Sequence, residues 1–281
     1  MKDLIQRRLE QYQSKNANDE ENAVKEISQE VLLYALSKSG FFRDAAFLGG
    51  TCLRIVHGVD RFSEALDFSL KDPDPSFNLD QHLDAIKEQM TIFGFNIEVS
   101  GIGKSETNVS ARFLKDDSLK KILKFTHYSD IQKKIKIKIE VDKNPPAGAD
   151  TVSTFVDFPT DFAIRTHDLP SLFAGKCHAL LCRNYVKGRD WFDFSWYVSN
   201  RVKINYQLLS NALNQVGPWQ NQKAKVDELW LKRELLGRVQ EVEWPEALRD
   251  MSRFVRSDQT ESLSFWGQEL FTAKVQKMFE I

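Results

Sequence analysis

The chain has 281 residues, of which 42% are hydrophobic and 28% are charged. This composition is that of an ordinary globular protein with one large or two small domains, and it excludes intrinsic disorder as the main state. Its 39 Lys and Arg residues nearly balance its 40 Asp and Glu residues, so any nucleic acid would have to bind a local basic patch rather than a general positive field.

Cysteine content and apolar runs restrict where the protein works. The chain has three cysteines, Cys52, Cys177 and Cys182, an odd and sparse set that is unlike a disulfide scaffold and fits a reducing cytoplasm. The N-terminal residues lack the apolar core of a signal peptide, and no window approaches the ~18 uninterrupted apolar residues of a membrane span. We therefore expect a cytoplasmic protein with no membrane partner.

Residues 1–39 are predicted to be helical. Apolar residues recur at helical spacing over residues 4–12, a polar break follows at residues 14–22, and a second periodic run covers residues 23–39. Gly40 directly follows this run, and glycine is typical of a helix end.

Residues 41–143 change to short apolar runs rich in β-branched and aromatic residues, which predict strands. The runs are AAFLGG, LDFSL, FNIEVSGI, NVSARFL and IKIKIEVD, and a helix-like segment, NLDQHLDAIKEQMTIFG, separates the second from the third. This order predicts a small mixed sheet flanked by helices. The segment KNPPAGADTVST, residues 143–154, is predicted to be a loop.

The remainder of the chain, from about residue 168, returns to apolar stripes of helical period. The predicted helices are SLFAGKCHALLCRNY, RDWFDFSWYVSN, NYQLLSNALNQVG, AKVDELWLKRELLGRVQEV and SFWGQELFTAKVQKMFE. The whole pattern predicts an α/β fold with three parts: N-terminal helices at 1–39, an α/β core at 40–160 and a helical C-terminal domain at 161–281.

A Gly49-Gly50-Thr51 turn lies where a predicted strand runs into a predicted helix. Glycines let the backbone approach a ligand closely, and the amides and dipole of a helix N-terminus favour a phosphate group. Taken alone, the motif is equally consistent with an ordinary structural turn.

Two predicted strands carry acidic residues. Alternate residues of a strand share a face, so Ser63, position 65 and Asp67 point the same way. In the alternating run IKIKIEVD, Glu140 and Asp142 lie on the face opposite the apolar residues. A carboxylate from this run beside Asp67 would make a cluster able to hold Mg²⁺. The alternative is a solvated polar face on which the acidic residues balance the neighbouring lysines.

With these motifs the chain resembles the minimal nucleotidyltransferases of the AbiEii/AbiGii toxin family, toxins of bacterial toxin–antitoxin and phage-defence systems. The resemblance rests on GGT followed by RFSEALDFSL, and on the later block LPSLFAGKCHALLCRNYVKGRDWFDFSWY. It covers about residues 30–200. It implies an α+β minimal nucleotidyltransferase fold in which the helical C-terminal domain completes the active-site cleft.

The resemblance assigns several residues to an NTP substrate. They are Gly49, Gly50, Thr51, Arg61, Ser63 and Lys176. The Gly-Gly-Thr turn would cradle the triphosphate, and Arg61 and Lys176 would neutralise charge on the leaving pyrophosphate. Ser63 would bind a phosphate oxygen or, as a less favoured alternative, itself accept a nucleotide or phosphate group.

By the same resemblance, Asp67 with Glu140 or Asp142 would hold Mg²⁺ or Mn²⁺, and the choice between the last two residues stays open. Asp190 or Asp193 would orient the catalytic lysine or the nucleotide. The alternative for that lysine is a cation on a helix surface, and for Asp190 it is a helix cap or an ion pair with Arg189.

Position 65 departs from the family pattern. The family has Asp-x-Asp here, whereas this chain has Ala65 ahead of Asp67, so the first catalytic carboxylate is missing. Glu64 cannot replace it, because neighbouring residues of a strand face opposite sides. We expect severely reduced transferase activity. Either the chain is a naturally inactive relative or an aspartate has been replaced, and the intact neighbouring motif favours replacement.

The activity that the resemblance implies is transfer of a nucleoside monophosphate from an NTP to an RNA 3′ hydroxyl, with tRNA as the favoured acceptor, which would block translation. An antitoxin protein is implied as partner. Two alternatives stay open: a kinase-like phosphotransferase acting on a protein or small molecule, and a non-catalytic relative that binds nucleotide, RNA or protein.

A candidate basic surface for the RNA lies in residues 115–143, which hold nine lysines against five acidic residues. The alternative is ordinary solvated charge. The aromatic and C-terminal basic residues that would join this surface are Phe113, Phe125, Tyr128, Arg233, Arg238, Arg249, Arg253 and Arg256.

Overall fold

The computed structural model describes residues 2–280 except 102–107, 117, 120–122 and 128–133, and it divides into two compact units. Unit 1 comprises Met1–Pro145 and Val152–Thr166, and unit 2 comprises Pro146–Thr151 and His167–Ile281. Residues 146–151 are bonded within unit 2, because Asn205 Nδ2 donates to the carbonyl of Gly148 at 2.8 Å.

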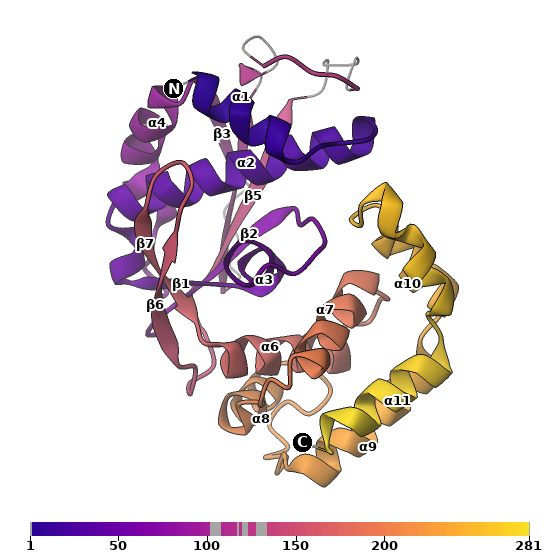
Figure 1. The fold of residues 1–281 in the computed structure, drawn as a ribbon. Coiled ribbons are helices and arrows are strands. Elements are labelled where there is room, and N and C mark those ends of the chain that lie inside the picture. Colours follow the sequence, from indigo (N-terminus) through magenta and orange to yellow (C-terminus); the bar gives the residue numbers. More distant parts are fainter. Residues whose placement is uncertain (1, 102–107, 117, 120–122, 128–133, 281) are drawn as a thin grey trace. The chain divides into compact units, whose positions relative to one another are not determined.

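Unit 1 is built on a seven-stranded mixed sheet with the order β3-β4-β5-β2-β1-β7-β6 (Figure 1). The strands are β1 (Ala45–Leu48), β2 (Ala65–Leu70), β3 (Ile97–Gly101), β4 (Val109–Asp116), β5 (Ile135–Asp142), β6 (Thr151–Val156) and β7 (Phe162–His167). Its helices are α1 (Lys2–Gln11), α2 (Ala17–Lys38), α3 (Gly49–His57) and α4 (Leu83–Ile92), with 3-10 turns η1 (Phe41–Arg43) and η2 (Leu79–His82). The predicted small mixed sheet with flanking helices is confirmed.

The two central strands alternate between buried apolar and half-buried polar residues, as their sequences predict. Their buried residues are Leu66, Phe68, Ile137, Ile139 and Val141. Helices α2 and α4 pack on each other and contact β5 and β3 respectively, which covers the apolar face of the sheet. The opposite face carries Asp67, Glu140 and Asp142, all of them half-buried.

Helix α2 starts six residues earlier than its apolar pattern predicts, at Ala17 rather than residue 23. Asn16 caps it, with its side-chain oxygen accepting the Asp19 N–H at 2.9 Å. The polar residues that suggested a break make tertiary contacts instead. Glu20, for example, accepts the backbone N–H groups of Thr126 and His127, each at 2.8 Å.

The prediction of a loop over residues 143–154 is wrong at its C-terminal end, because Thr151–Val156 forms β6. Its β-branched residues favour a strand. β6 is an edge strand with little burial, and Phe155 is 77% exposed, so the apolar pattern that marks an inner strand is weak here.

Unit 2 is helical, as predicted. Its helices are α6 (Leu169–Cys182), α7 (Gly188–Ser199), α8 (Tyr206–Gln215), α9 (Glu228–Glu241), α10 (Trp244–Met251) and α11 (Gln268–Met278), with the 3-10 segment η3 (Ser257–Phe265). Helix α10 was not expected from the sequence, although Pro245 in its first turn is a typical helix-start signal. It packs against α7.

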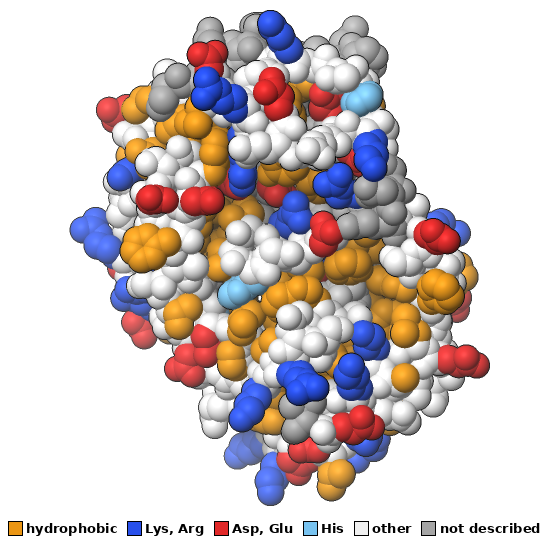
Figure 2. Space-filling view, viewed as in Figure 1, with side chains coloured by type: hydrophobic (Ala, Val, Ile, Leu, Met, Phe, Trp, Pro, Cys, Tyr) orange, Lys and Arg blue, Asp and Glu red, His pale blue; other side chains and the backbone are white. Residues whose placement is uncertain are grey.

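The surface and the cysteines agree with the composition. On the face shown in Figure 2, basic and acidic side chains are interspersed, in keeping with the near-zero net charge. The three cysteines are free thiols. Among the described residues, no helix has the length and apolar character that crossing a membrane requires.

The contact between α7 and α10 gives a stability prediction. A Cβ on Gly188 would lie 1.9 Å from the carbonyl oxygen of Ala247, a backbone atom that cannot move alone. Gly188→Ala should therefore lower the free energy of unfolding by about 1–3 kcal/mol and lower the melting temperature. In α9, Gly237 has no heavy atom within 4 Å of its Cβ position, so Gly237→Ala should raise stability by about 0.5–1 kcal/mol. Equal melting temperatures for the two variants would contradict this packing.

Candidate functional site

The polar face of unit 1 places two carboxylates side by side. Strands β2 and β5 run parallel with Asp67 paired to Glu140 and Ala65 paired to Lys138. Because paired residues project from the same side of a sheet, Asp67 and Glu140 are direct neighbours. Asp142 lies two residues further along β5. The register thus distinguishes Glu140 from Asp142 as the neighbour of Asp67, a choice that the sequence left open.

The two β5 carboxylates have different partners. Glu140 Oε1 lies 2.8 Å from Lys138 Nζ, and both side chains are about one third exposed (31% and 35%). Asp142 accepts the backbone N–H of Asn144 at 2.9 Å. Burial raises the pKa of Asp142, and the hydrogen bond from Asn144 partly opposes that rise. Glu140 therefore belongs to the row beside Asp67, whereas Asp142 closes the turn that ends β5.

The strand-to-helix turn brings backbone against Asp67. Gly49 has φ +79°, in the left-handed region, and a Cβ there would lie 2.6 Å from Asp67 Oδ2. The carboxylate therefore lies against the first residue of α3, where backbone amides have no acceptor within the helix. Only glycine allows both the backbone conformation and this close approach.

Arg61 packs against the next residue of the same turn. A Cβ on Gly50 would lie 2.5 Å from an Arg61 guanidinium nitrogen. The Arg61 residue is 2% exposed, and it donates to the carbonyl of Phe62 at 2.9 Å. Its contact with the turn is therefore made from a buried position.

Thr51 and Ser63 join α3 and β2 to their surroundings. Thr51 is fully buried, and its hydroxyl donates to the carbonyl of Ala65. The Ser63 carbonyl accepts from Gln29 Nε2 of α2 at 3.0 Å. Unit 1 thus brings the predicted turn, Arg61 and the β2 carboxylate together, with the Thr51 side chain directed into the protein.

The oxygen donors of Asp67 and Glu140 suit a cation that has further ligands. Within the part of the chain that the structure describes, no group of three or more His, Cys, Asp or Glu side chains could hold a metal ion. Mg²⁺ is commonly held by one or two carboxylates together with substrate phosphates and water. Asp67 and Glu140 therefore fit a cation shared with a phosphate ligand, and Ala65 occupies the position next to them in β2.

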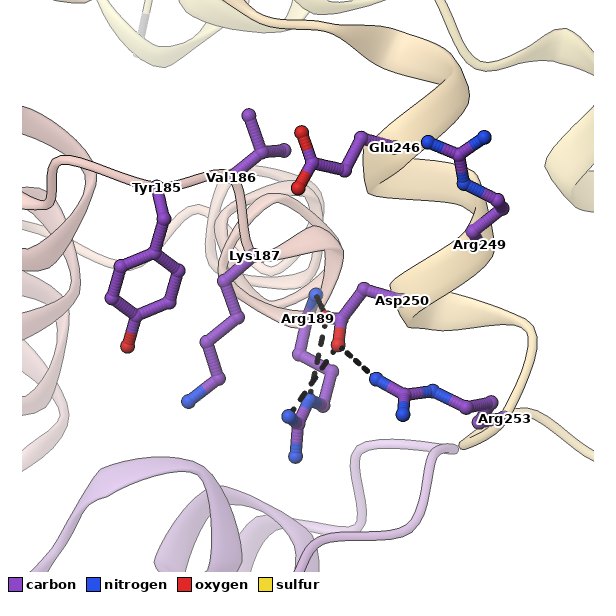
Figure 3. Close-up of a pocket in the computed structure, with 8 residues that line it drawn as sticks. All are labelled: Tyr185, Val186, Lys187, Arg189, Glu246, Arg249, Asp250 and Arg253. Carbon is purple, nitrogen blue, oxygen red and sulfur yellow. Dashed lines mark hydrogen bonds and ion pairs between the residues drawn. The ribbon is translucent and has the colours of Figure 1, made fainter.

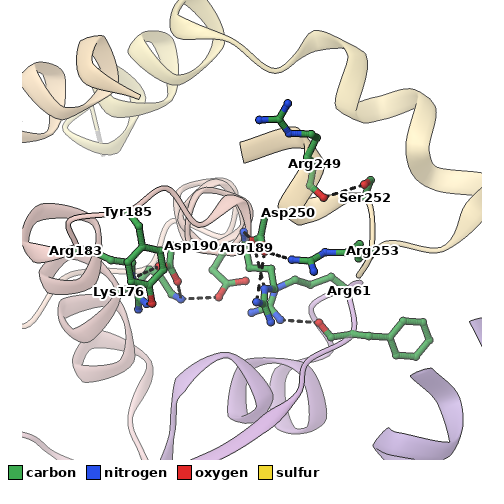
Figure 4. Close-up of polar contacts among 12 residues, drawn as sticks. Arg61, Lys176, Arg183, Tyr185, Arg189, Asp190, Arg249, Asp250, Ser252 and Arg253 are labelled. Atoms are coloured by element: carbon green, nitrogen blue, oxygen red, sulfur yellow. Dashed lines mark hydrogen bonds and ion pairs between the residues drawn. The ribbon is translucent and has the colours of Figure 1, made fainter. Parts of the chain in front are cut away.

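Unit 2 contains a buried ion cluster at Lys176 (Figure 4). From α6, its ammonium lies 2.6 Å from Asp190 Oδ1 and 2.8 Å from Asp193 Oδ2, both on α7. The Lys176 side chain is 11% exposed, and the aspartate side chains are 4% and 0% exposed. The three residues that the sequence singled out in this block are thus in direct contact.

Additional cations make the cluster net positive. Arg183 Nε lies 3.1 Å from Asp190 Oδ2. Burial by itself would raise the pKa of Asp190, but the charges of Lys176, Lys187 and Arg183 outweigh it and lower the pKa to about 2. Burial lowers the pKa of Lys187, which Asp190 opposes. Three cations thus surround two carboxylates.

Arg189 meets Asp250 of α10, a partner that the sequence did not suggest. Its backbone N–H lies 3.2 Å and its Nε 3.4 Å from Asp250 Oδ2 (Figure 3). Sequence reasoning missed Asp250 because α10 was not expected. The signal that could have found it is the amphipathic segment WPEALRDM with proline in its first turn.

The expected basic surface is divided between the units. The lysine-rich segment belongs to unit 1, where Lys134 pairs with Glu98 at 2.7 Å and the Lys136 ammonium lies 3.7 Å from the Phe113 ring centroid. In unit 2, Arg238 donates to the carbonyl of Leu180 at 3.1 Å. Four residues of the expected surface lie outside the described residues: Lys120, Lys121, Tyr128 and Lys133.

Comparisons with known proteins identify the family and the fold of the chain. The profile of a family described as nucleotidyl transferase AbiEii toxin, type IV TA system, matches residues 31–274. Two structures from Helicobacter pylori are similar at 14% identity: JHP933 (TM-score 0.51, covering 92% of this chain and 89% of that chain) and a proposed nucleotidyltransferase (TM-score 0.50, 89% of each). At this level of identity the two structures show similarity of fold only. None of the curated proteins matches the chain.

The ion cluster predicts an acid-sensitive unit 2. Lys176→Met leaves Asp190 and Asp193 buried without their main counter-charge, so unfolding free energy should fall by about 3–5 kcal/mol at neutral pH. In the parent chain the lowered pKa of Asp190 contributes stability that is complete above pH ~4 and is lost as pH falls toward 2. This loss should be shallower in the variant.

Chemical denaturation of both proteins between pH 7 and pH 2 measures the effect. Lys203→Met, which changes an exposed lysine of the same unit, is the matched control and should follow the parent chain. Equal stability of the Lys176 and Lys203 variants would show that the cluster is not stabilising.

Proposed function

The chain belongs to the AbiEii nucleotidyl transferase toxin family of type IV toxin–antitoxin systems, and on that premise we propose that it transfers a nucleoside monophosphate from an NTP to the 3′ hydroxyl of an RNA. We favour tRNA as the acceptor and a block of translation as the result. The observation that carries the proposal is the contact of Gly49, at the start of α3, with Asp67, whose strand neighbour is Glu140.

In this proposal the turn binds phosphate and the carboxylates hold a divalent cation. The amides at the start of α3 and the helix dipole favour a phosphate at Gly49 and Gly50. Asp67 and Glu140 would hold Mg²⁺ or Mn²⁺, which when bound neutralises phosphate charge and orients the attacking oxygen. Glu140 is preferred to Asp142 because of its register with Asp67.

The remaining residues have supporting roles. Arg61 packs against Gly50 from a buried position, so we assign it to the shape and positive potential of the turn. Thr51 would contribute its backbone amide, since its hydroxyl is bonded to Ala65. Ser63 lies just before β2 and would face the phosphates.

In unit 2, Lys176 would supply positive charge to the phosphates, with Asp190 and Asp193 fixing its ammonium in place. The excess of cations in the cluster supports an anionic ligand. The carboxylates leave the ammonium little freedom to move, which suits electrostatic stabilisation by a preorganised group.

Ala65 is the proposed cause of low activity in this chain. Its partner across the strands is Lys138, whose ammonium pairs with Glu140. A carboxylate at position 65 would add a third acidic group to the row and would offset the Lys138 charge near Glu140. Without it, only Asp67 and Glu140 would hold the cation, and the Lys138 ammonium would compete with it for Glu140.

The family also supports a cognate antitoxin as partner. Because NTP and tRNA are the proposed substrates, we propose that the protein acts in the cytoplasm. A kinase-like transfer of the γ-phosphate uses similar metal–triphosphate geometry and remains the competing reaction. The two are separated by their products, which are pyrophosphate for nucleotidyl transfer and a nucleoside diphosphate for phosphoryl transfer.

Restoring the carboxylate tests the proposal. Ala65→Asp should raise label transfer from one of the four α-labelled NTPs to total tRNA by at least about 100-fold in the presence of Mg²⁺, with release of pyrophosphate. Ala65→Asn is the matched control, because the amide has nearly the same shape without the charge, and it should stay as inactive as the parent chain.

Each other result has a definite meaning. If the product is a nucleoside diphosphate rather than pyrophosphate, the reaction is phosphoryl transfer and the proposal of nucleotidyl transfer is wrong. If the Ala65→Asp and Ala65→Asn variants are equally active, the side chain at position 65 does not bind the cation. If the folded Ala65→Asp protein transfers no label to tRNA from any of the four NTPs, the proposal of tRNA as acceptor is overturned.

A further inference from the structure

Unit 2 has a pocket of about 530 Å³ between the loop that precedes α7 and helix α10 (Figure 3). Its lining includes Tyr185 and Lys187 from the loop, Arg189 from α7 and Arg253 just beyond α10. The proposed reaction assigns no role to this pocket, although its Lys187 also contributes positive charge near Asp190. In Figure 3 the polar ends of Tyr185, Lys187 and Arg189 extend toward the same side.

Two of the pocket's guanidinium groups, those of Arg189 and Arg253, contact the same carboxylate. Asp250 accepts from Arg253 at 3.0 Å and lies 3.4 Å from Arg189 Nε, so one carboxylate orients two guanidinium groups. The Arg189 guanidinium also stacks 3.7 Å from the ring centroid of Phe254, which is buried. Groups oriented in advance lose little conformational entropy when an anion binds.

The charge balance limits which anion the pocket suits. Four cationic side chains line it against two carboxylates. Cations outnumber carboxylates in this lining, which favours an anion of low charge such as a phosphodiester. A triphosphate is more highly charged, and the carboxylates of Glu246 and Asp250 would repel it in the absence of a cation.

Tyr185 adds a platform for a base. The residue is 59% exposed, and its position is supported by Arg183, which donates to its hydroxyl and lies 4.8 Å from its ring centroid. An exposed aromatic ring beside basic groups is the arrangement by which proteins bind single-stranded nucleic acid. Glu246 can accept from a ribose hydroxyl or a base amino group, partners that inorganic phosphate lacks.

We propose that this pocket binds the acceptor RNA, taking a phosphodiester at Lys187, Arg189 and Arg253 and stacking a base of its single-stranded end on Tyr185. The identity of the ligand rests on the proposed function. The binding itself needs neither the missing carboxylate nor an NTP, so it can be measured on the chain with Ala65.

The test is fluorescence anisotropy with a labelled single-stranded RNA of twelve nucleotides, without NTP or divalent cation. Arg253→Ala should weaken binding about tenfold and should reduce the salt dependence by about 0.7 in the log–log slope, the value for one lost phosphate contact. Tyr185→Leu should weaken binding about tenfold, whereas Tyr185→Phe, which keeps the ring, should stay within about twofold.

Matched controls lie on the same unit outside the pocket. Lys203→Ala removes an exposed cation of the loop that precedes α8, and Phe265→Leu removes an aromatic residue that is 76% exposed. Both should bind the RNA as the parent chain does. If the pocket variants bind no more weakly than these controls, the proposal is overturned.

Two further arms separate this inference from the proposed reaction. If Mg²⁺-NTP displaces the RNA from the parent chain but not from Arg253→Ala, the pocket serves the NTP, which overturns the assignment to RNA. In the Ala65→Asp background, transfer activity whose KM for RNA is unchanged by Arg253→Ala would overturn the inference while the reaction stands. Weakened RNA binding without any transfer would support the pocket while the reaction fails.

Discussion

The parallel pairing of β2 with β5 is the constraint on which the candidate site in unit 1 depends. It sets Asp67 beside Glu140 and Ala65 beside Lys138, on the face opposite the buried apolar residues. A shift of one residue would turn one strand's polar side chains into the core, so burial of Ile139 and its neighbours holds the acidic pair in register. The tight turn at Gly49 then brings the start of α3 against the same carboxylate.

Unit 2 relies on a different kind of interaction, a buried set of charges. Lys176, Asp190 and Asp193 have little contact with water, and removing charges from water is costly unless each is paired. Such clusters often add little net stability, yet they hold groups in a definite geometry. The cations around Asp190 lower its pKa to about 2, so the carboxylate is ionised at neutral pH and pairs with the Lys176 ammonium.

How well the sequence predicted each element depends on whether its signal is local. The strand Ile135–Asp142 alternates strictly and was predicted with its observed bounds. Strands β6 and β7 and the short helix α10 were not predicted, because none of the three is long enough to bury a long periodic stripe. The start of α2 was misplaced, since its polar first turns bind other parts of the chain rather than solvent.

The sequence by itself determined the family, the mixed α/β and helical character of the chain, the glycine turn and the face of β2 that carries Asp67. These follow from side-chain periodicity and from backbone conformations that only particular residues adopt. Only the tertiary structure decided that Glu140 rather than Asp142 lies opposite Asp67, and that Asp250 meets Arg189. Those pairings join segments far apart in the chain, and their register is set by how whole elements pack, which no local pattern encodes.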